Sequence, residues 1–162
     1  MTETQTHSNT STSGSDLTPP TEVERARLEA ALSDAERDVL LHHGTEAPFC
    51  GGLLDNKHDG VYCCRLCGLP LFQAKTKFQS GTGWPSFWAP FDETHVAKVR
   101  DSSFGMVRVE TRCARCGSHQ GHLFPDGPPP TGNRYCINSV SLEFIDDAST
   151  LSDPLGRGDA IG

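Results

Sequence analysis

The chain has 162 residues, a formal net charge of −7 and a hydrophobic fraction of 35%, which suits one domain with a core of its own. It has no Lys/Arg cluster for a nucleic-acid backbone and no apolar run long enough to span a membrane. Because the N-terminus also lacks the basic and apolar segments of an export signal, we expect a cytoplasmic protein that binds neither nucleic acid nor membrane.

Residues 1–18 are rich in Ser, Thr, Gln, Asn and Gly and contain almost no large apolar side chain. Such a segment buries too little surface to offset the entropy of ordering, so we expect a disordered tail. Two helices should follow, and Gly44 is the expected end of the second helix. Each helix starts with the S/T-x-x-E pattern of a capping box, formed by Thr21 with Glu24 and by Ser33 with Glu36.

After the helices, short apolar runs alternate with Gly, Pro, Asp and Asn, which is typical of short strands joined by turns. We therefore predict a mainly β fold of antiparallel strands behind two N-terminal helices. Residues 104–111 alternate as a half-buried strand does. Val107 and Val109 would lie on one face, with Arg108 and Glu110 on the other.

The segment 127–132 contains three consecutive prolines, which cannot donate to a strand ladder, and we expect a loop there. In the run 135–144, every second residue from Cys136 onward is mostly apolar. If the run is a strand, Cys136 and Asn138 point to the apolar side together. The expected organisation is a tail at 1–18, a folded domain at 19–146 and a frayed C-terminal tail at 147–162.

Seven cysteines in a chain without an export signal favour metal ligation or catalysis, since structural disulfides are rare in reducing compartments. Two C-x-x-C-G units could place four thiolates at the corners of a tetrahedron, and the glycine after each pair suits a turn with positive φ. The two units are separated by 46 positions, against about fifteen to twenty in a compact zinc ribbon, so the metal should join two distant hairpins. Four sulfurs leave no open position, which indicates a structural role, with zinc as the default metal and iron as the alternative. The predicted ligands are Cys64, Cys67, Cys113 and Cys116.

Cys136 is the candidate nucleophile among the remaining cysteines. Arg134 lies two residues before it and would favour the thiolate, which is the nucleophilic form. A lone cysteine on an inward strand face is more often a small buried hydrophobic residue. His119 and His122 shift this balance, because they follow the second C-x-x-C unit and can supply a proton and hold a polar oxygen. Alone, an H-x-x-H pattern more often marks metal ligands or surface residues, but four thiolates already fill the tetrahedron.

The glycine-rich segment 77–87 contributes a third element. It contains Trp84 and Phe87, which on their own could be plain core side chains. The functional interpretation is an aromatic wall that receives a methylated sulfur, because sulfur and its methyl groups pack well on indole.

Together these motifs resemble the B-type peptide methionine sulfoxide reductases from about Thr45 to Phe144. The resemblance implies two antiparallel sheets in a tent-like or barrel-like arrangement, with a zinc ion far from the reacting groups. It also implies reduction of the R epimer of methionine sulfoxide, with a thioredoxin-type protein as reductant. The matching segments are 45–49, 56–62, 77–87, 119–128 and 134–139.

By the same resemblance, the thiolate of Cys136 attacks the sulfoxide sulfur and becomes a sulfenic acid, which a second thiol must reset. The remaining implied roles are binding and protonation of the sulfoxide oxygen by His119, His122 and Asn138, packing on the substrate by Trp84 and Phe87, and support from Asp126 and Arg134.

The family often carries the resolving cysteine in its S-G-x-G-W-P loop, but Thr82 holds that position here. Cys50 is the favoured replacement, because it lies in a glycine-flanked segment that could swing toward Cys136. A disulfide requires Cα atoms about 4.4 to 6.8 Å apart, so the bridge would draw on movement of this segment. Cys63 is the second candidate and is more restrained, since it adjoins a predicted metal ligand. An external thiol is the third alternative.

A zinc-ribbon binding module without catalysis is the competing interpretation. Such a module would carry a basic surface studded with aromatic side chains, and the net charge of −7 argues against it. The sequence does not distinguish free from protein-bound methionine sulfoxide. Oligomeric state is not encoded by any of these motifs either, and a monomer is the default expectation.

Overall fold

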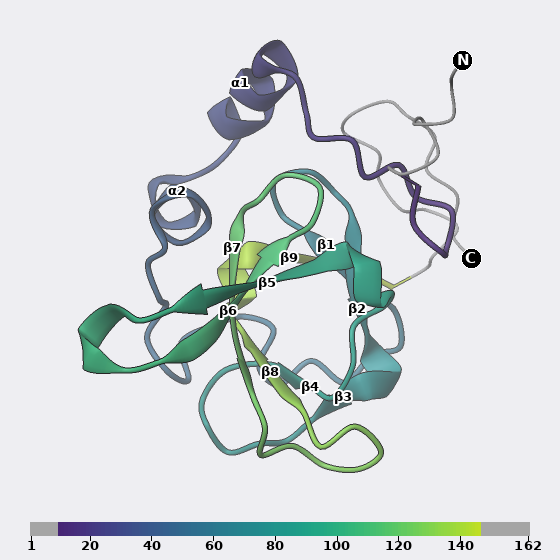
Figure 1. Ribbon diagram of the computed structural model, residues 1–162, viewed down its shortest axis with the longest axis vertical. Coiled ribbons are helices and arrows are strands. Elements are labelled where there is room, and N and C mark those ends of the chain that lie inside the picture. Colours follow the sequence, from purple (N-terminus) through teal and green to yellow (C-terminus); the bar gives the residue numbers. More distant parts are fainter. Residues whose placement is uncertain (1–9, 147–162) are drawn as a thin grey trace.

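The computed structural model describes residues 10–146, in which two short helices precede nine strands (Figure 1). The helices are α1 (Glu22–Ala30) and α2 (Asp34–His42), and the strands are β1 (Val61–Cys64), β2 (Pro70–Gln73), β3 (Lys77–Phe78), β4 (Ser86–Phe87), β5 (Val96–Asp101), β6 (Arg108–Cys113), β7 (His119–Phe124), β8 (Arg134–Ile137) and β9 (Leu142–Ile145).

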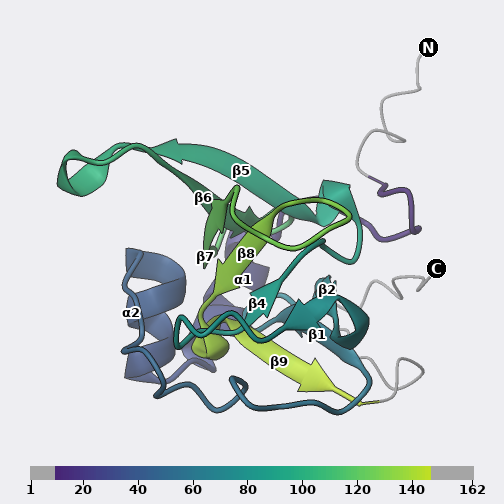
Figure 2. The same ribbon diagram turned by 90° about the horizontal axis from the view of Figure 1, so that it is seen from below.

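The strands form two antiparallel sheets. The smaller sheet has the order β2-β1-β9, and the larger has the order β3-β4-β8-β7-β6-β5. The β5–β6 hairpin projects beyond the rest of the body (Figure 2). The prediction of a mainly β fold with two antiparallel sheets and two N-terminal helices is confirmed. Within the described residues, no helix has the length and apolar character needed to cross a membrane.

Both helices begin at the predicted capping boxes. Thr21 and Ser33 each accept a hydrogen bond from the amide three residues later, and the glutamate at that position accepts one from the cap amide. Such caps are worth about 1 kcal/mol each. The end of α2 differs slightly from the expectation, because His43 and not Gly44 adopts the left-handed conformation, with φ 61°. The amide of Gly44 closes the turn by donating to the Asp38 carbonyl at 2.9 Å.

Aromatic side chains from both sheets fill the centre of the core. The rings of Phe72 and Phe87 stack with centroids 4.4 Å apart, and Tyr62 meets Phe87 edge-on at 5.1 Å. Tyr135 lies against Phe72 at 5.6 Å. These residues come from β1, β2, β4 and β8, so the core joins the smaller sheet to the strand that carries Cys136.

The described part of the predicted N-terminal tail, residues 10–18, contacts the folded body. Ser11 and Ser15 are buried, and the hydroxyl of Ser11 lies 2.9 Å from Nε2 of His95. The amide of Ser13 donates to a carboxylate oxygen of Asp92 at 2.9 Å. Polar contacts therefore hold this stretch against the folded body, although it has little apolar surface. The remainder of the two predicted tails, 1–9 and 147–162, lies outside the described residues.

The run 135–144 is not one strand. β8 ends at Ile137, a 3-10 turn covers Ser139–Ser141, and β9 then joins the other sheet. Within β8 the buried face is the reverse of the predicted one, because Tyr135 and Ile137 are both 0% exposed while Cys136 is only partly buried and faces the pocket. The turn then resets the parity after Asn138. This turn is also where α2 packs, which places the helix end close to the site.

The faces of β6 are the reverse of what its apolar pattern suggests. Val107 and Val109 are 68% and 37% exposed, whereas Glu110 is only 5% exposed. The predicted strand also starts late, because a 3-10 turn occupies Ser103–Gly105. The charged face turns inward because basic side chains of β6, of β7 and of the residue that caps α2 surround the Glu110 carboxylate.

Candidate active site and metal centre

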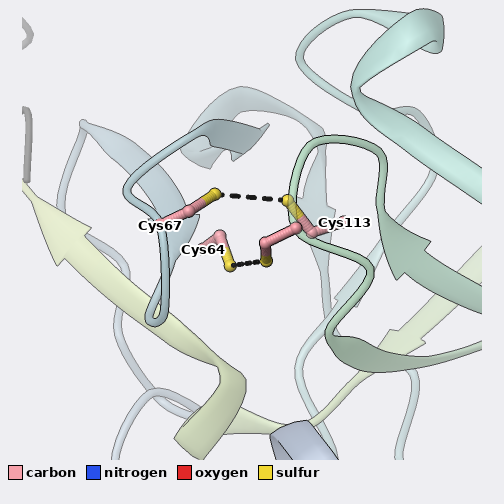
Figure 3. Close-up of side chains that lie close together, drawn as sticks. Cys64, Cys67 and Cys113 are labelled. Atoms are coloured by element: carbon pink, nitrogen blue, oxygen red, sulfur yellow. Dashed lines mark hydrogen bonds between the residues drawn. The ribbon is translucent and has the colours of Figure 1, made fainter. Parts of the chain in front are cut away.

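Four buried cysteines meet between the β1–β2 turn and the β6–β7 turn (Figure 3). The Sγ atoms of Cys64 and Cys116 lie 3.6 Å apart, and those of Cys67 and Cys113 lie 3.5 Å apart. All four sulfurs lie within 4.8 Å of one another. The glycines that follow the two pairs have φ of 83° and 78°, as predicted. The four cysteines could hold a metal ion, and the two hairpins that they join belong to different sheets.

The surroundings of the four sulfurs fit a bound cation. The hydroxyl of Ser118 lies 3.2 Å from the sulfurs of both Cys64 and Cys116, and the Gln120 amide donates to Cys64 at 3.7 Å. Burial alone would raise the pKa of Cys64, but hydrogen bonds from the neighbouring thiols and Ser118 hold it well below its usual range. Burial raises the pKa of Cys113. Sulfurs that share negative charge in a dry cage require a positive ion, and four of them complete a tetrahedral shell.

A separate pocket surrounds the predicted nucleophile. Cys136 and His122 are directly paired across β8 and β7, so the thiol and an imidazole share one face of the larger sheet. Four of the predicted site residues line this pocket together with four that the sequence did not indicate. The lining residues are Thr45, Trp84, Arg108, Gly121, His122, Phe124, Cys136 and Asn138.

The thiol of Cys136 is partly buried, and this burial raises its pKa above the ordinary value for cysteine. The guanidinium of Arg134 and a hydrogen bond with Thr82 oppose this rise, and the carboxylate of Glu46 adds to it. Arg134 therefore has the predicted effect, but desolvation outweighs it. Its side chain is held by Asp126, with Nε and Oδ1 2.8 Å apart. The protonated thiol is thus the resting form.

Each predicted histidine is bound to a carboxylate of the β5–β6 hairpin. Nε2 of His122 lies 2.8 Å from Oδ2 of Asp101, and Nδ1 of His119 lies 2.6 Å from Oε2 of Glu110. Burial lowers the pKa of His119, although the Glu110 carboxylate opposes this. Such carboxylates fix the tautomer and the orientation of an imidazole. Sequence reasoning missed both carboxylates, because Asp101 lies outside the predicted strand 104–111 and the alternation of that strand placed Glu110 on the face opposite the valines.

His119 lines an adjoining pocket and not the one that contains Cys136. The two pockets share Thr45, Arg108 and His122, and the rings of His119 and His122 lie 5.6 Å apart, edge to face. The two histidines are therefore neighbours, but only His122 faces the thiol directly.

The side chain of Asn138 ties the loop before β1 to the pocket. Its Oδ1 accepts a hydrogen bond from the Glu46 amide at 3.0 Å, and its Nδ2 donates to the Gln120 carbonyl at 3.0 Å. The carbonyl of Glu46 in turn accepts from Nε1 of Trp84 at 3.0 Å. This chain of bonds fixes the indole as one wall of the pocket, and packing of Trp84 on a substrate stays a prediction.

Phe87 was predicted to contact substrate, but the structure contradicts this. Its side chain is 0% exposed and packs between Tyr62 and Phe72 in the core. The reason is that β4 lies between β3 and β8 in its sheet, and the side chain points to the face that meets the residues of the smaller sheet.

The two candidates for a second redox thiol differ in exposure. Cys50 is exposed, whereas Cys63 is buried in β1, where burial and the charge of Glu143 raise its pKa. Neither belongs to the described residues that line the Cys136 pocket. Residue Phe49, just before Cys50, has φ 64°, a strained value for a bulky side chain. Thr82, which occupies the usual resolving position, contacts the thiol of Cys136.

Comparison with known proteins gives consistent results. Residues 32–146 match the family model of the SelR domain. The chain is 72% identical over 151 residues to the peptide methionine sulfoxide reductase MsrB of Caulobacter vibrioides (strain NA1000 / CB15N), covering 93% of this chain and 95% of that protein. The protein of the same name from Xylella fastidiosa (strain M23) is 62% identical over 144 residues, covering 89% and 93%. The one from Escherichia coli (strain K12 / DH10B) is 54% identical over 119 residues, covering 74% and 87%.

Proposed function

The chain belongs to the SelR domain family of methionine sulfoxide reductases, and on this premise we propose that it reduces the R epimer of methionine sulfoxide to methionine. The observation that carries the proposal is the pairing of Cys136 with His122 in a pocket walled by Trp84. A thiol, an imidazole and an indole are the groups that attack a sulfoxide sulfur, protonate its oxygen and bind its methyl group. We propose the repair of oxidised proteins as the role of this activity.

In the first step, the sulfur of Cys136 attacks the sulfoxide sulfur and takes over its oxygen. The S–O bond of the substrate breaks while an S–O bond forms on Cys136, so the substrate becomes the sulfide and the thiol becomes a sulfenic acid. The thiol is oxidised by two electrons, and its proton ends on the sulfenic acid. Because burial raises the pKa of Cys136, this proton is still present when substrate arrives.

His122 is the side chain that we propose to carry the proton. With Nε2 donating to Asp101, Nδ1 is left to accept a proton from the thiol and pass it to the departing oxygen. We propose that His119 supports this exchange from the adjoining pocket. Asn138 would hold the indole wall and offer its remaining amide hydrogen to the oxygen, while Asp126 fixes Arg134 beside the thiol.

In the second step, a second thiol attacks the sulfenic acid of Cys136, which releases water and forms a disulfide. We propose Cys50 for this role, since it is exposed and follows the strained Phe49. The buried Cys63 is the weaker candidate, and an external thiol is the third. A thioredoxin-type dithiol would then reduce the disulfide by exchange. The cytoplasmic location and monomeric state stay predictions.

We propose that the metal of the four-cysteine cluster is zinc. Four thiolates in a closed tetrahedron are a common structural zinc site, and zinc has no redox chemistry that would disturb a thiol enzyme. The ion would join the β1–β2 and β6–β7 turns and so fix the start of β7, because its ligand Cys116 lies three residues before His119. It supplies no group to the reaction.

The main test uses Cys136→Ser with the two epimers of methionine sulfoxide supplied separately. The wild type should reduce the R epimer and leave the S epimer unchanged, and the variant should lose at least about a thousandfold in rate. Product methionine is measured by chromatography, with zinc content and circular dichroism as controls for folding. Retention of full activity in Cys136→Ser would refute the assignment of the nucleophile.

The resolving thiol is tested by one turnover without reductant, followed by peptide mass mapping. A Cys50–Cys136 disulfide is expected in the wild type, and Cys50→Ser should stop at the sulfenic acid. A Thr82→Cys change in the Cys50→Ser background should restore a disulfide, because residue 82 already contacts Cys136. A Cys63–Cys136 link in the wild type would instead identify Cys63 as the resolving residue.

A further inference from the structure

A second group of metal-ligating side chains lies between the end of α2 and the inward face of β6 and β7. Nδ1 of His43 and Nδ1 of His119 lie 2.8 and 2.6 Å from the same carboxylate oxygen, Oε2 of Glu110. These three atoms lie within 4.8 Å of one another. The left-handed backbone of His43, with φ 61°, turns its ring away from the helix and over Glu110.

We propose that His43, Glu110 and His119 form a second metal site, which takes up a divalent transition metal such as Zn²⁺ when free metal is in excess. Two imidazoles and one carboxylate are a donor set that binds zinc with its fourth position open. Ligand distances of about 2.0 to 2.2 Å place tetrahedral ligand atoms about 3.3 Å apart. Each imidazole nitrogen must therefore move away from Glu110 by only about 0.5 to 0.7 Å to admit the ion.

The burial of the three side chains differs in a way that suits metal entry. The His43 side chain is 48% exposed, whereas those of Glu110 and His119 are 7% and 2% exposed. An ion can therefore approach from solvent at His43 and be held by two groups that water does not fully surround. Metal binding requires a neutral imidazole, and burial lowers the pKa of His119 in the direction that keeps it neutral.

The charges around the site predict that it binds metal more weakly than the four cysteines do. Arg112 donates to Oε1 of Glu110 at 2.8 Å, so Oε2, between the two imidazoles, is the oxygen that would bind the ion, while the guanidinium opposes a further positive charge nearby. Thiolates in the cysteine cluster provide more negative charge and four ligands. The second site should therefore fill only after the first.

Filling the second site should inhibit the enzyme, and this consequence depends on the proposed function. The ion would bind Nδ1 of His119 and the carboxylate of Glu110. The His119 ring is a neighbour of the His122 ring, with centroids 5.6 Å apart. Both histidines line the pocket that adjoins Cys136. Excess zinc would thus slow reduction by immobilising the imidazole pair beside the thiol.

The binding test uses protein with one equivalent of zinc already bound and with Cys50 and Cys136 changed to serine, so that no reactive thiol competes. Calorimetric titration with Zn²⁺ should reveal a second equivalent, which His43→Asn weakens at least tenfold. Asparagine tolerates the left-handed backbone, so this variant removes the ligand without disturbing the end of α2. His42→Gln, one residue earlier on the same helix, is the matched control and should bind as before. No second equivalent, or one that His43→Asn leaves unchanged, overturns the proposal.

The activity test uses the zinc-loaded enzyme with its cysteines intact and divides each rate by the same variant's rate without added zinc. His43→Asn should require at least tenfold more zinc for half inhibition than the wild type or His42→Gln. Equal inhibition in all three would overturn the inhibitory role while the binding result stands. Absence of any reductase activity without added zinc would refute the proposed function and not the metal site.

Discussion

The four-cysteine cluster and the Cys136 pocket both contact β7, yet they are constructed differently. The cluster is closed and buried, and its ligands come from two tight turns. The pocket is open, and its side chains come from β6, β7, β8 and the loops before β1 and β4. Gln120 in β7 touches both, since its amide donates to Cys64 and its carbonyl accepts from Asn138. A rigid cluster thereby anchors one side of a site assembled from distant segments.

The difference shows which kind of site depends on local geometry and which on the whole fold. Each C-x-x-C-G turn places two sulfurs by itself, so the cluster needs only the two turns to meet. The pocket requires the register between β7 and β8, because a shift of one residue would turn His122 away from Cys136. We therefore expect changes in the cluster to affect stability and changes in the pocket to affect rate.

The largest expected effect is that of Cys67→Ser. Removing one ligand from the proposed metal site should release the metal and lower the free energy of unfolding by at least about 4 kcal/mol, because the proposed ion would join the two sheets. Chemical denaturation and zinc analysis measure both quantities. Cys136→Ser is the matched control and should keep its metal and most of its stability. Equal losses of stability in the two variants would remove the distinction between the regions.

The parts that sequence predicted well are those in which the signal is local. The capping boxes at Thr21 and Ser33 and the cysteine pairs each depend on residues within one turn, and the structure contains all of them. Phe87 was misassigned because its neighbours in the sequence line the site, whereas its strand position points it into the core. No local pattern distinguishes these two directions.

The two carboxylates of the β5–β6 hairpin were missed for a related reason. Asp101 and Glu110 pair with histidines that lie 21 and 9 positions further along the chain, so only the folded sheet reveals the pairs. The alternation of β6 did predict that Arg108 and Glu110 share a face. It could not indicate that this face is the inner one, because the apolar face of an alternating strand, here that of the valines, is normally the buried one.

A smaller effect is expected from Asp101→Asn. The amide can still accept a hydrogen bond from Nε2 of His122 but no longer stabilises a positive imidazolium, so reduction should slow by about 10- to 100-fold. Steady-state kinetics should show the loss mainly in kcat, with little change in melting temperature. A variant at an exposed acidic position outside the pocket, Glu93→Gln, is the control. An unchanged kcat in Asp101→Asn would mean that the carboxylate does not assist proton transfer.

The smallest effect is expected from Arg134→Gln, which tests how charge and burial compete at the thiol. Burial raises the pKa of Cys136 and Arg134 lowers it, so removing the guanidinium should raise this pKa further. The thiolate fraction increases as pH rises through the pKa, and the variant should therefore need a higher pH for the same alkylation rate. At a fixed pH below the pKa, we expect iodoacetamide to react more slowly by no more than about tenfold in a Cys50→Ser background.

Asp126→Asn provides the opposite control for that experiment, because it keeps the positive charge of Arg134 and removes its partner. Alkylation of Cys136 should not slow in this variant. If Arg134→Gln and Asp126→Asn gave the same pH profile as the wild type, burial alone would set the reactivity of the thiol. Desolvation would then be the main influence on the pKa of Cys136, as it is on the pKa of Cys113 in the cysteine cluster.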